Sequence, residues 1–80
     1  MKKALEYIVT SIVDDKKAVV IDESEEEGII NFGISVATED IGKIIGKDGK
    51  IIRSIRTAMR IPAMKENKRI HITINDQQQQ

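Results

Sequence analysis

A four-residue segment with a glycine at each end, residues 46–49, constrains this fold more than any other feature. Apolar residues recur at helical spacing on both sides of it, over residues 41–45 and again from Lys50 onward. Glycine adopts positive φ without strain and, because it has no Cβ, lets another backbone approach closely. The pattern therefore predicts two helices joined by a tight Gly-x-x-Gly turn.

The turn could also bind an anion, because it directly precedes the start of a helix. The first N–H groups of a helix lack intrahelical acceptors and the helix dipole is positive there, so anions are favoured. Lys47 and Lys50 add positive charge, whereas Asp48 removes some. Glycines at a helix corner can also serve only to relieve strain, and the motif by itself leaves both roles open.

Size and composition favour one small globular domain. The 80 residues are 40% hydrophobic, which suits a single compact core. No apolar run approaches the roughly 20 residues of a membrane span, and Glu6 interrupts the stretch that a signal peptide would need. We therefore expect a cytoplasmic protein with no membrane partner. The absence of cysteine excludes disulfides and thiolate metal sites.

The first half of the chain shows one helical and two strand-like patterns. Apolar residues at spacings of three and four predict a helix over residues 2–13, ending near two aspartates. Short β-branched and alternating patterns predict strands over 18–21 and 30–36. The acidic run between them, residues 23–28, is expected to be a solvated loop longer than a two-residue turn.

The second half predicts two helices and a final strand. Thr38 is placed to cap the short helix ahead of the turn. The longer helix is expected to end near Met59, because Pro62 disfavours helical geometry at the residue before it. Isoleucines alternating with polar residues then predict a half-buried strand over 69–75.

These elements predict an α+β fold in the order α-β-β-α-α-β, with a three-stranded sheet packed on helices. The fold is expected to occupy residues 1–76 as a single domain. Four glutamines at 77–80 have no apolar face, so we expect them to be disordered.

Charge is unevenly distributed although the net charge is zero, with 13 basic and 13 acidic residues. Residues 41–60 contain six basic residues and one acid, a net charge of +5, whereas residues 14–27 contain two basic residues and seven acids, a net charge of −5. The molecule should therefore have a basic side that attracts an anionic partner and an acidic end that repels one.

The longer helix divides into an apolar and a basic face at about 100° per residue. The basic face starts at the turn and contains no acid, which favours an anion-binding track over an ordinary solvated face. The apolar members are Ile51, Ile52, Ile55, Ala58 and Met59, and the basic members are Lys50, Arg53, Arg56 and Arg60.

The short helix is expected to supply an apolar groove beside the turn. Ile41, Ile44 and Ile45 cannot all face inward on so short a segment. Gly42 removes bulk from the remaining side. The groove would offer aliphatic contacts next to the anion-binding turn.

The sequence lacks the chemical groups that an enzymatic role would require. His71 is the only histidine and falls on the polar side of the last strand, and no cysteine is available as a nucleophile. Neither Gly46-Lys47 nor Gly49-Lys50 is followed by Ser or Thr, so the turn does not match a Walker A loop. The sequence predicts a protein that is not an enzyme and indicates no cofactor.

Residues 36–56 closely resemble the signature of KH domains, including its I-I-G-x-x-G core at residues 44–49. The predicted element order is similar to the prokaryotic type II form. Together with the first helix, the acidic hairpin and residues 65–70, it makes the chain similar to the small stand-alone bacterial KH proteins of the KhpA type.

This resemblance implies non-catalytic binding of single-stranded RNA in the cytoplasm, with about four nucleotides clamped at the Gly-x-x-Gly turn. It further implies a role in post-transcriptional regulation or as an RNA chaperone, and a link to cell growth or division. The candidate RNA-binding residues are Ile41, Gly42, Lys43, Ile44, Ile45, Gly46, Lys47, Asp48, Gly49, Lys50, Arg53 and Arg56.

The partners implied by the resemblance include a second copy of the chain, as a homodimer, or another KH-containing RNA-binding protein, as a heterodimer. A protein-interaction or adaptor module is therefore the alternative function, since a small sheet with an edge strand can also dimerise. Tyr7 and Phe32 are both expected in the core, which argues against recognition by exposed aromatic residues.

Overall fold

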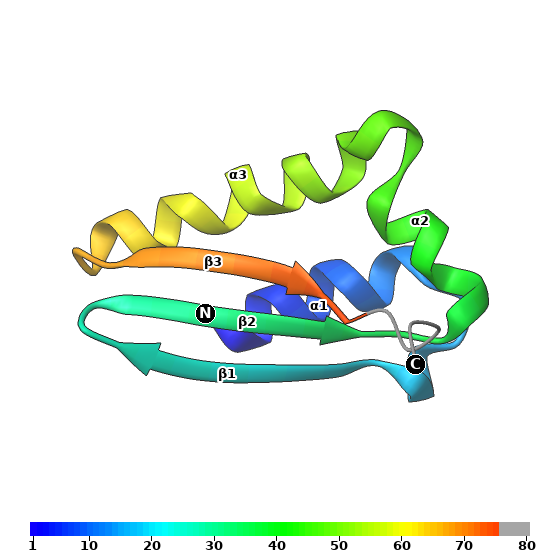
Figure 1. Cartoon of the computed structure of the whole chain (residues 1–80), viewed down its shortest axis with the longest axis horizontal. Helices are drawn as coiled ribbons and strands as arrows, with labels where there is room; N and C mark the ends of the chain where they lie inside the picture. The colour runs from blue at the N-terminus through cyan, green and yellow to red at the C-terminus, as the bar shows by residue number, and fades with distance from the viewer. Residues whose placement is uncertain (76–80) are drawn as a thin grey trace.

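The computed structural model describes residues 1–75. The predicted glutamine tail and residue 76 lie outside the described residues, so the predicted limit of the domain stays a prediction. The chain forms α1 (Lys2–Ile12), β1 (Val20–Glu26), β2 (Ile29–Ser35), α2 (Ile41–Ile45), α3 (Lys50–Lys65) and β3 (Arg69–Ile74) (Figure 1). This confirms the α-β-β-α-α-β order and the α+β class.

The sheet has three strands in the order β1-β2-β3. β1 pairs antiparallel with β2, and β2 pairs parallel with β3. The two ladders have different connections, because a short turn can join antiparallel strands but a parallel pair needs a long crossover. Here α2, the Gly-x-x-Gly turn and α3 form that crossover (Figure 1).

The predicted loop over residues 23–28 is wrong, because β1 extends to Glu26 and only two residues form the turn. Glu27 and Gly28 both have positive φ, 52° and 80°, the geometry whose twist matches that of a hairpin. The acids are tolerated because each lies opposite a residue of β2 that carries no charge, as in the pairs Asp22↔Gly33 and Glu25↔Ile30. The predicted strand over residues 18–21 overlaps β1 only at Val20 and Ile21, because the rest of β1 lacks an apolar alternation.

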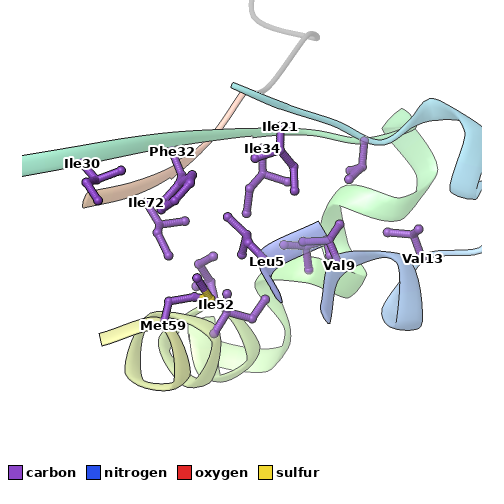
Figure 2. Close-up of a cluster of buried hydrophobic side chains, with 13 residues drawn as sticks. Leu5, Val9, Val13, Ile21, Ile30, Phe32, Ile34, Ile52, Met59 and Ile72 are labelled. Atoms are coloured by element: carbon purple, nitrogen blue, oxygen red, sulfur yellow. The ribbon is translucent and has the colours of Figure 1, made fainter. Parts of the chain in front are cut away.

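The hydrophobic core lies between the sheet and two helices. Figure 2 shows α1 and α3 on the same side of the sheet, with the core side chains between them. Ile30, Phe32 and Ile34 alternate along β2 and are buried, so the predicted place of Phe32 in the core is confirmed. The predicted place of Tyr7 is wrong, because its position on α1 turns away from the core and its side chain is 75% exposed.

α3 does not end near Met59 but continues through Pro62 to Lys65. A helix can hold a proline near its end when packing offsets the lost hydrogen bond, and Ala63, one residue later, is fully buried. The end is set by Asn67, whose φ is 57°. Its N–H bonds to Met64 O at 3.1 Å and the N–H of Lys68 bonds to Ala63 O at 2.9 Å, which together form a Schellman motif.

The predicted cap of the short helix is also wrong. Thr38 begins a single 3₁₀ turn over Thr38–Asp40 and makes no capping hydrogen bond through its side chain. Asp40 therefore stands directly before α2. Within residues 1–75 none of the helices has the length and apolar character that crossing a membrane requires.

Candidate nucleic-acid interface

The Gly-x-x-Gly turn joins α2 to α3 through three residues with positive φ. Gly46 has φ 75° and ψ 176°, a region that is essentially restricted to glycine. Gly49 is left-handed, with φ 74° and ψ 17°. Asp48 also has positive φ, 56°, which aspartate tolerates better than most side chains. The backbone therefore makes the tight turn that the two glycines predict.

Close packing explains why Gly46 has no side chain. A Cβ there would lie 2.2 Å from Cγ1 of Ile51 and 2.9 Å from its backbone nitrogen. A Cβ on Gly49 would meet only Ile52, at 4.0 Å. Gly46 is thus required by both conformation and space, whereas Gly49 is required by conformation.

The turn presents backbone N–H groups at the start of a 16-residue helix. The N–H groups of Gly46 and Gly49 bond to Gly42 O and Gly46 O, at 2.8 and 3.2 Å. Within residues 1–75 the N–H groups of Lys47 and Asp48 have no backbone acceptor. These two groups lie at the positive end of the α3 dipole, an arrangement suited to a phosphate oxygen.

Arg53 lies one turn into α3 and folds back over the Gly-x-x-Gly turn. Its Nη2 donates to Asp48 O at 2.5 Å and its Nε to Gly49 O at 3.4 Å. A guanidinium has five N–H donors, so these bonds leave others for a ligand. Arg53 therefore stabilises the turn and keeps a positive charge beside it. Lys50 and Arg53 line one hollow on the surface of α3, together with Ser54, Thr57 and Ala58.

Lys43, one of the candidate RNA-binding residues, is paired with two acidic side chains, so its charge is largely neutralised. Its Nζ forms an ion pair with Asp14 and lies 3.7 Å from Oδ1 of Asp40. Hydrogen bonding to the Asp14 carboxylate, ahead of its charge and that of Asp40, raises the pKa of Lys43. Lys43 joins the end of α1 to α2 and supports the turn indirectly.

Asp40 is a residue of this region that the sequence did not single out. It is fully buried, and its Oδ2 accepts the N–H of Asp15 at 3.0 Å. That hydrogen bond is the main cause that lowers the pKa of Asp40, assisted by the Asp14 N–H and Lys43 against the opposing effect of burial. The sequence did contain one signal of this role, since Asp40 directly precedes a short helix with a lysine three residues later. The same pattern is equally typical of an exposed ion pair.

The isoleucines of α2 separate into buried and exposed members. Ile44 is fully buried and supports the turn from the core, so it does not line the surface beside the turn. Ile45 is 38% exposed, Ile41 is half-buried and Gly42 is exposed, with open space where a Cβ would project. The surface beside the turn is thus lined by Ile41, Gly42 and Ile45.

The basic residues of α3 divide between two sides of the helix. Lys50 and Arg53 lie at the turn, whereas Nη2 of Arg56 donates to Ile72 O of β3 at 3.2 Å. Arg56 thus lies in a second hollow between α3 and β3, together with Arg60. Arg56 therefore lies against β3, apart from the pair of basic residues at the turn.

The predicted apolar face of α3 is narrower than expected. Ile52, Ile55 and Met59 are buried, but Ile51 is 38% exposed and Ala58 is exposed. These two residues form the rim of an apolar hollow between α1 and α3. The hollow is lined by Ile8, Ile12, Ile51, Ser54, Ile55 and Ala58.

A parallel β2–β3 pair joined by α2, a Gly-x-x-Gly turn and α3, with an antiparallel β1 and a leading helix, defines a type II KH domain. Comparison with known families agrees, since the sequence model described as "KhpA/KhpB, KH domain" matches residues 2–74. The chain belongs to the KhpA/KhpB KH-domain family. A KH domain is a non-catalytic kind of domain, which confirms the prediction that the protein is not an enzyme.

Curated relatives match over nearly their whole length. The RNA-binding protein KhpA of Clostridium acetobutylicum is 45% identical over 74 residues, which cover 92% of this chain and 99% of the relative. The RNA-binding protein KhpA of Oceanobacillus iheyensis is 40% identical with the same coverage. The RNA-binding protein KhpA of Chlamydia pneumoniae is 40% identical over 77 residues, which cover 96% of this chain and 99% of the relative.

Proposed function

We propose that this protein binds single-stranded RNA without catalysis, by holding the sugar-phosphate backbone at the Gly-x-x-Gly turn. The observation that carries the proposal is the pair of N–H groups of Lys47 and Asp48, which have no backbone acceptor within residues 1–75 and lie at the positive end of α3. KH modules clamp about four nucleotides through such a turn. The RNA-binding names of its relatives support the same ligand.

The residues around the turn have complementary roles in this clamp. Lys47 and Lys50 attract phosphates, and Arg53 both supports the turn and adds charge. Ile41, Gly42 and Ile45 provide an aliphatic surface on which bases can rest without aromatic stacking. We place this activity in the cytoplasm, where the protein would act in post-transcriptional regulation or as an RNA chaperone.

Charge reversal at the turn tests the clamp. Lys47→Asp gives the pair Asp-Asp between the two glycines and should weaken RNA binding about tenfold or more, because it replaces an attraction with a repulsion at the phosphate site. Fluorescence polarisation with a labelled single-stranded RNA pool measures the change, and circular dichroism checks the fold. Lys2→Asp, on α1, changes the net charge equally and serves as the matched control. A folded Lys47→Asp protein with unchanged affinity would falsify the clamp.

The apolar hollow between α1 and α3 favours a second function, the binding of another protein chain. Its aliphatic lining is suited to a helix-to-helix contact with a second copy or with another KH-containing RNA-binding protein, and α1 also carries the exposed Tyr7. The apolar hollow shares Ser54 and Ala58 with the hollow of Lys50 and Arg53, but its remaining lining belongs to α1 and to the isoleucines of α3.

Salt separates the two functions. RNA binding should weaken steeply with ionic strength, at roughly −0.7 on a log–log plot for each phosphate contact, while an aliphatic interface should respond little. Ile8→Glu would place a charge on the α1 side of the apolar hollow, which Lys50 and Arg53 do not line, and should weaken self-association more than RNA binding to a single site. Equal losses in both assays would contradict the assignment of two surfaces.

A further inference from the structure

The conformation of Gly46 is one that a glycine does not fix by itself. With φ 75° and ψ 176°, Gly46 lies in a region that other residues avoid, but a glycine can leave this region for several others. Such conformations persist only where the surrounding groups hold them. Lys47 and Asp48 follow directly, so the direction of their N–H groups depends on what holds Gly46.

Hydrogen bonds hold only part of the turn. Arg53 bonds to the carbonyls of Asp48 and Gly49, which fixes the second half of the turn. The backbone bonds of Gly46 reach Gly42 and Gly49, so they join it to α2 and across the turn. Within residues 1–75 neither bond fastens Gly46 to the helical residues of α3.

Ile51 makes the contact between Gly46 and α3. The three atoms nearest to the place of a Cβ on Gly46 are the Cγ1, the Cβ and the backbone nitrogen of Ile51, at 2.2, 2.8 and 2.9 Å. Because a glycine leaves this place empty, the side chain of Ile51 fills it and packs on the Gly46 backbone.

We propose that Ile51 is a positioning residue of the clamp. It holds Gly46 against the first turn of α3, so that the N–H groups of Lys47 and Asp48 stay directed at a phosphate. This inference rests on the proposed function and adds to it a residue that was not among the candidate RNA-binding residues. Ile51 acts through Gly46 and needs no contact with RNA.

The chemistry and the place of Ile51 suit this role better than a role in the core. A β-branched side chain in a helix has one strongly preferred χ1 rotamer, so its γ carbons keep their places without further support. Ile52 packs into the hydrophobic core, whereas within residues 1–75 Ile51 lies outside it and is 38% exposed. The exposed side of Ile51 lines the apolar hollow between α1 and α3.

Two substitutions at Ile51 test the positioning with a labelled random-sequence tetranucleotide RNA pool in fluorescence polarisation. Ile51→Ala removes both γ carbons and should weaken binding at least about fivefold, because the binding reaction must then order about one backbone residue. Ile51→Val keeps both γ carbons and should bind within about twofold of the wild type. A tetranucleotide fills only one clamp, so a change in self-association through the apolar hollow does not alter the result.

The order of the Lys47 N–H group is a readout that a loss of stability does not move. Its NMR order parameter should be about 0.85 in the wild type and below about 0.6 in Ile51→Ala, while that of the buried Leu5 stays unchanged. Ile61→Ala is the matched control, because Ile61 is also an exposed isoleucine of α3. It should change neither the order of Lys47 nor the affinity for RNA.

The opposite results overturn the positioning role. A folded Ile51→Ala protein that binds RNA like the wild type, or that keeps Lys47 ordered, is one such result. Equal losses in Ile51→Ala and Ile51→Val are another, because the γ carbons would then not be the cause. If the wild-type protein binds no RNA, the proposed function is overturned, and the order of Lys47 alone decides whether Ile51 holds the turn.

Discussion

Gly46 and Gly49 hold equivalent places in the motif, yet their surroundings differ. Gly46 has positive φ and no room for a Cβ, because Ile51 occupies that space. Gly49 also has positive φ, but a Cβ there would meet only Ile52, at an ordinary contact distance. Gly42, four residues earlier, lies in α2 and has neither constraint. A motif of two glycines thus contains one position fixed by packing and one fixed by conformation alone.

Alanine substitutions should separate these effects. Gly46→Ala should lower the free energy of unfolding by about 3 kcal/mol, since backbone strain adds to a clash with Ile51. Gly49→Ala should lower it by about 1–2 kcal/mol through left-handed strain, and Gly42→Ala should raise it by about 0.5–1 kcal/mol. Urea unfolding followed by circular dichroism measures all three. Equal values for Gly46→Ala and Gly49→Ala would contradict the packing argument.

The residues of the turn were predictable because glycine, lysine and their spacing are visible in the sequence. The burial of Asp40 and the capture of Lys43 by Asp14 were not, because the ion pair of Lys43 joins residues 29 positions apart. Ile44 and Ile45 are neighbours of the same type, and only the packing of α2 decides that the first is buried and the second exposed.

Arg53 connects two elements, since its side chain on α3 bonds to carbonyls of the Gly-x-x-Gly turn. Arg53→Glu should therefore weaken RNA binding by about tenfold or more, because it removes a charge-assisted contact and adds repulsion. Lys2→Glu, on the distant α1, should have little effect. Polarisation titrations at several salt concentrations should also show a shallower slope for Arg53→Glu. Equal losses in the two variants would instead indicate diffuse attraction.

Asp40 connects the end of α1 to α2, and its charge should make that connection sensitive to pH. Its pKa is lowered in the folded state, so its contribution to stability is present above the usual carboxyl range, about 4, and is lost as pH falls through the lower folded value. Asp40→Asn should be less stable than the wild type at pH 7, with the difference shrinking at acidic pH.

Chemical unfolding at pH 7 and at pH 3 measures this effect. Asp14→Asn is the matched control, because Asp14 also pairs with Lys43 but its side chain is 81% exposed. A difference between Asp40→Asn and the wild type that stays constant with pH would contradict the role of the charge.

Among the elements, those with an apolar periodicity were predictable, namely α1, α2, β2, most of α3 and β3. β1 was mostly missed because its charged residues suit an edge strand only through their partners on β2. The end of α3 was misjudged because Pro62 is a more visible signal than Asn67, although Asn67 forms the actual stop. Pairing with β2 extends β1, and the burial of Ala63 carries α3 past Pro62, so in each case packing overrides the local preference.

The whole molecule should bind short RNA weakly and with little sequence selectivity. A clamp for about four nucleotides offers few base contacts, and Asp48 opposes the phosphates. Firm binding would then need a second module, supplied by another copy or another RNA-binding protein, that raises the effective concentration. Analytical ultracentrifugation, alone and with a long unstructured RNA, measures both properties. A strict monomer that binds a tetranucleotide at nanomolar concentration would contradict this prediction.

The parallel pairing of β3 with β2 has a consequence for how the protein acquires its site. Each pair in this ladder joins residues about 40 positions apart, so the chain must close a long loop before the pairing stabilises it. The clamp lies inside that loop, and α3 packs against β3 as well as against α1 and α2. During synthesis the RNA-binding turn should therefore mature last, after the final strand has left the ribosome, and a chain that ends within α3 should not yet hold RNA.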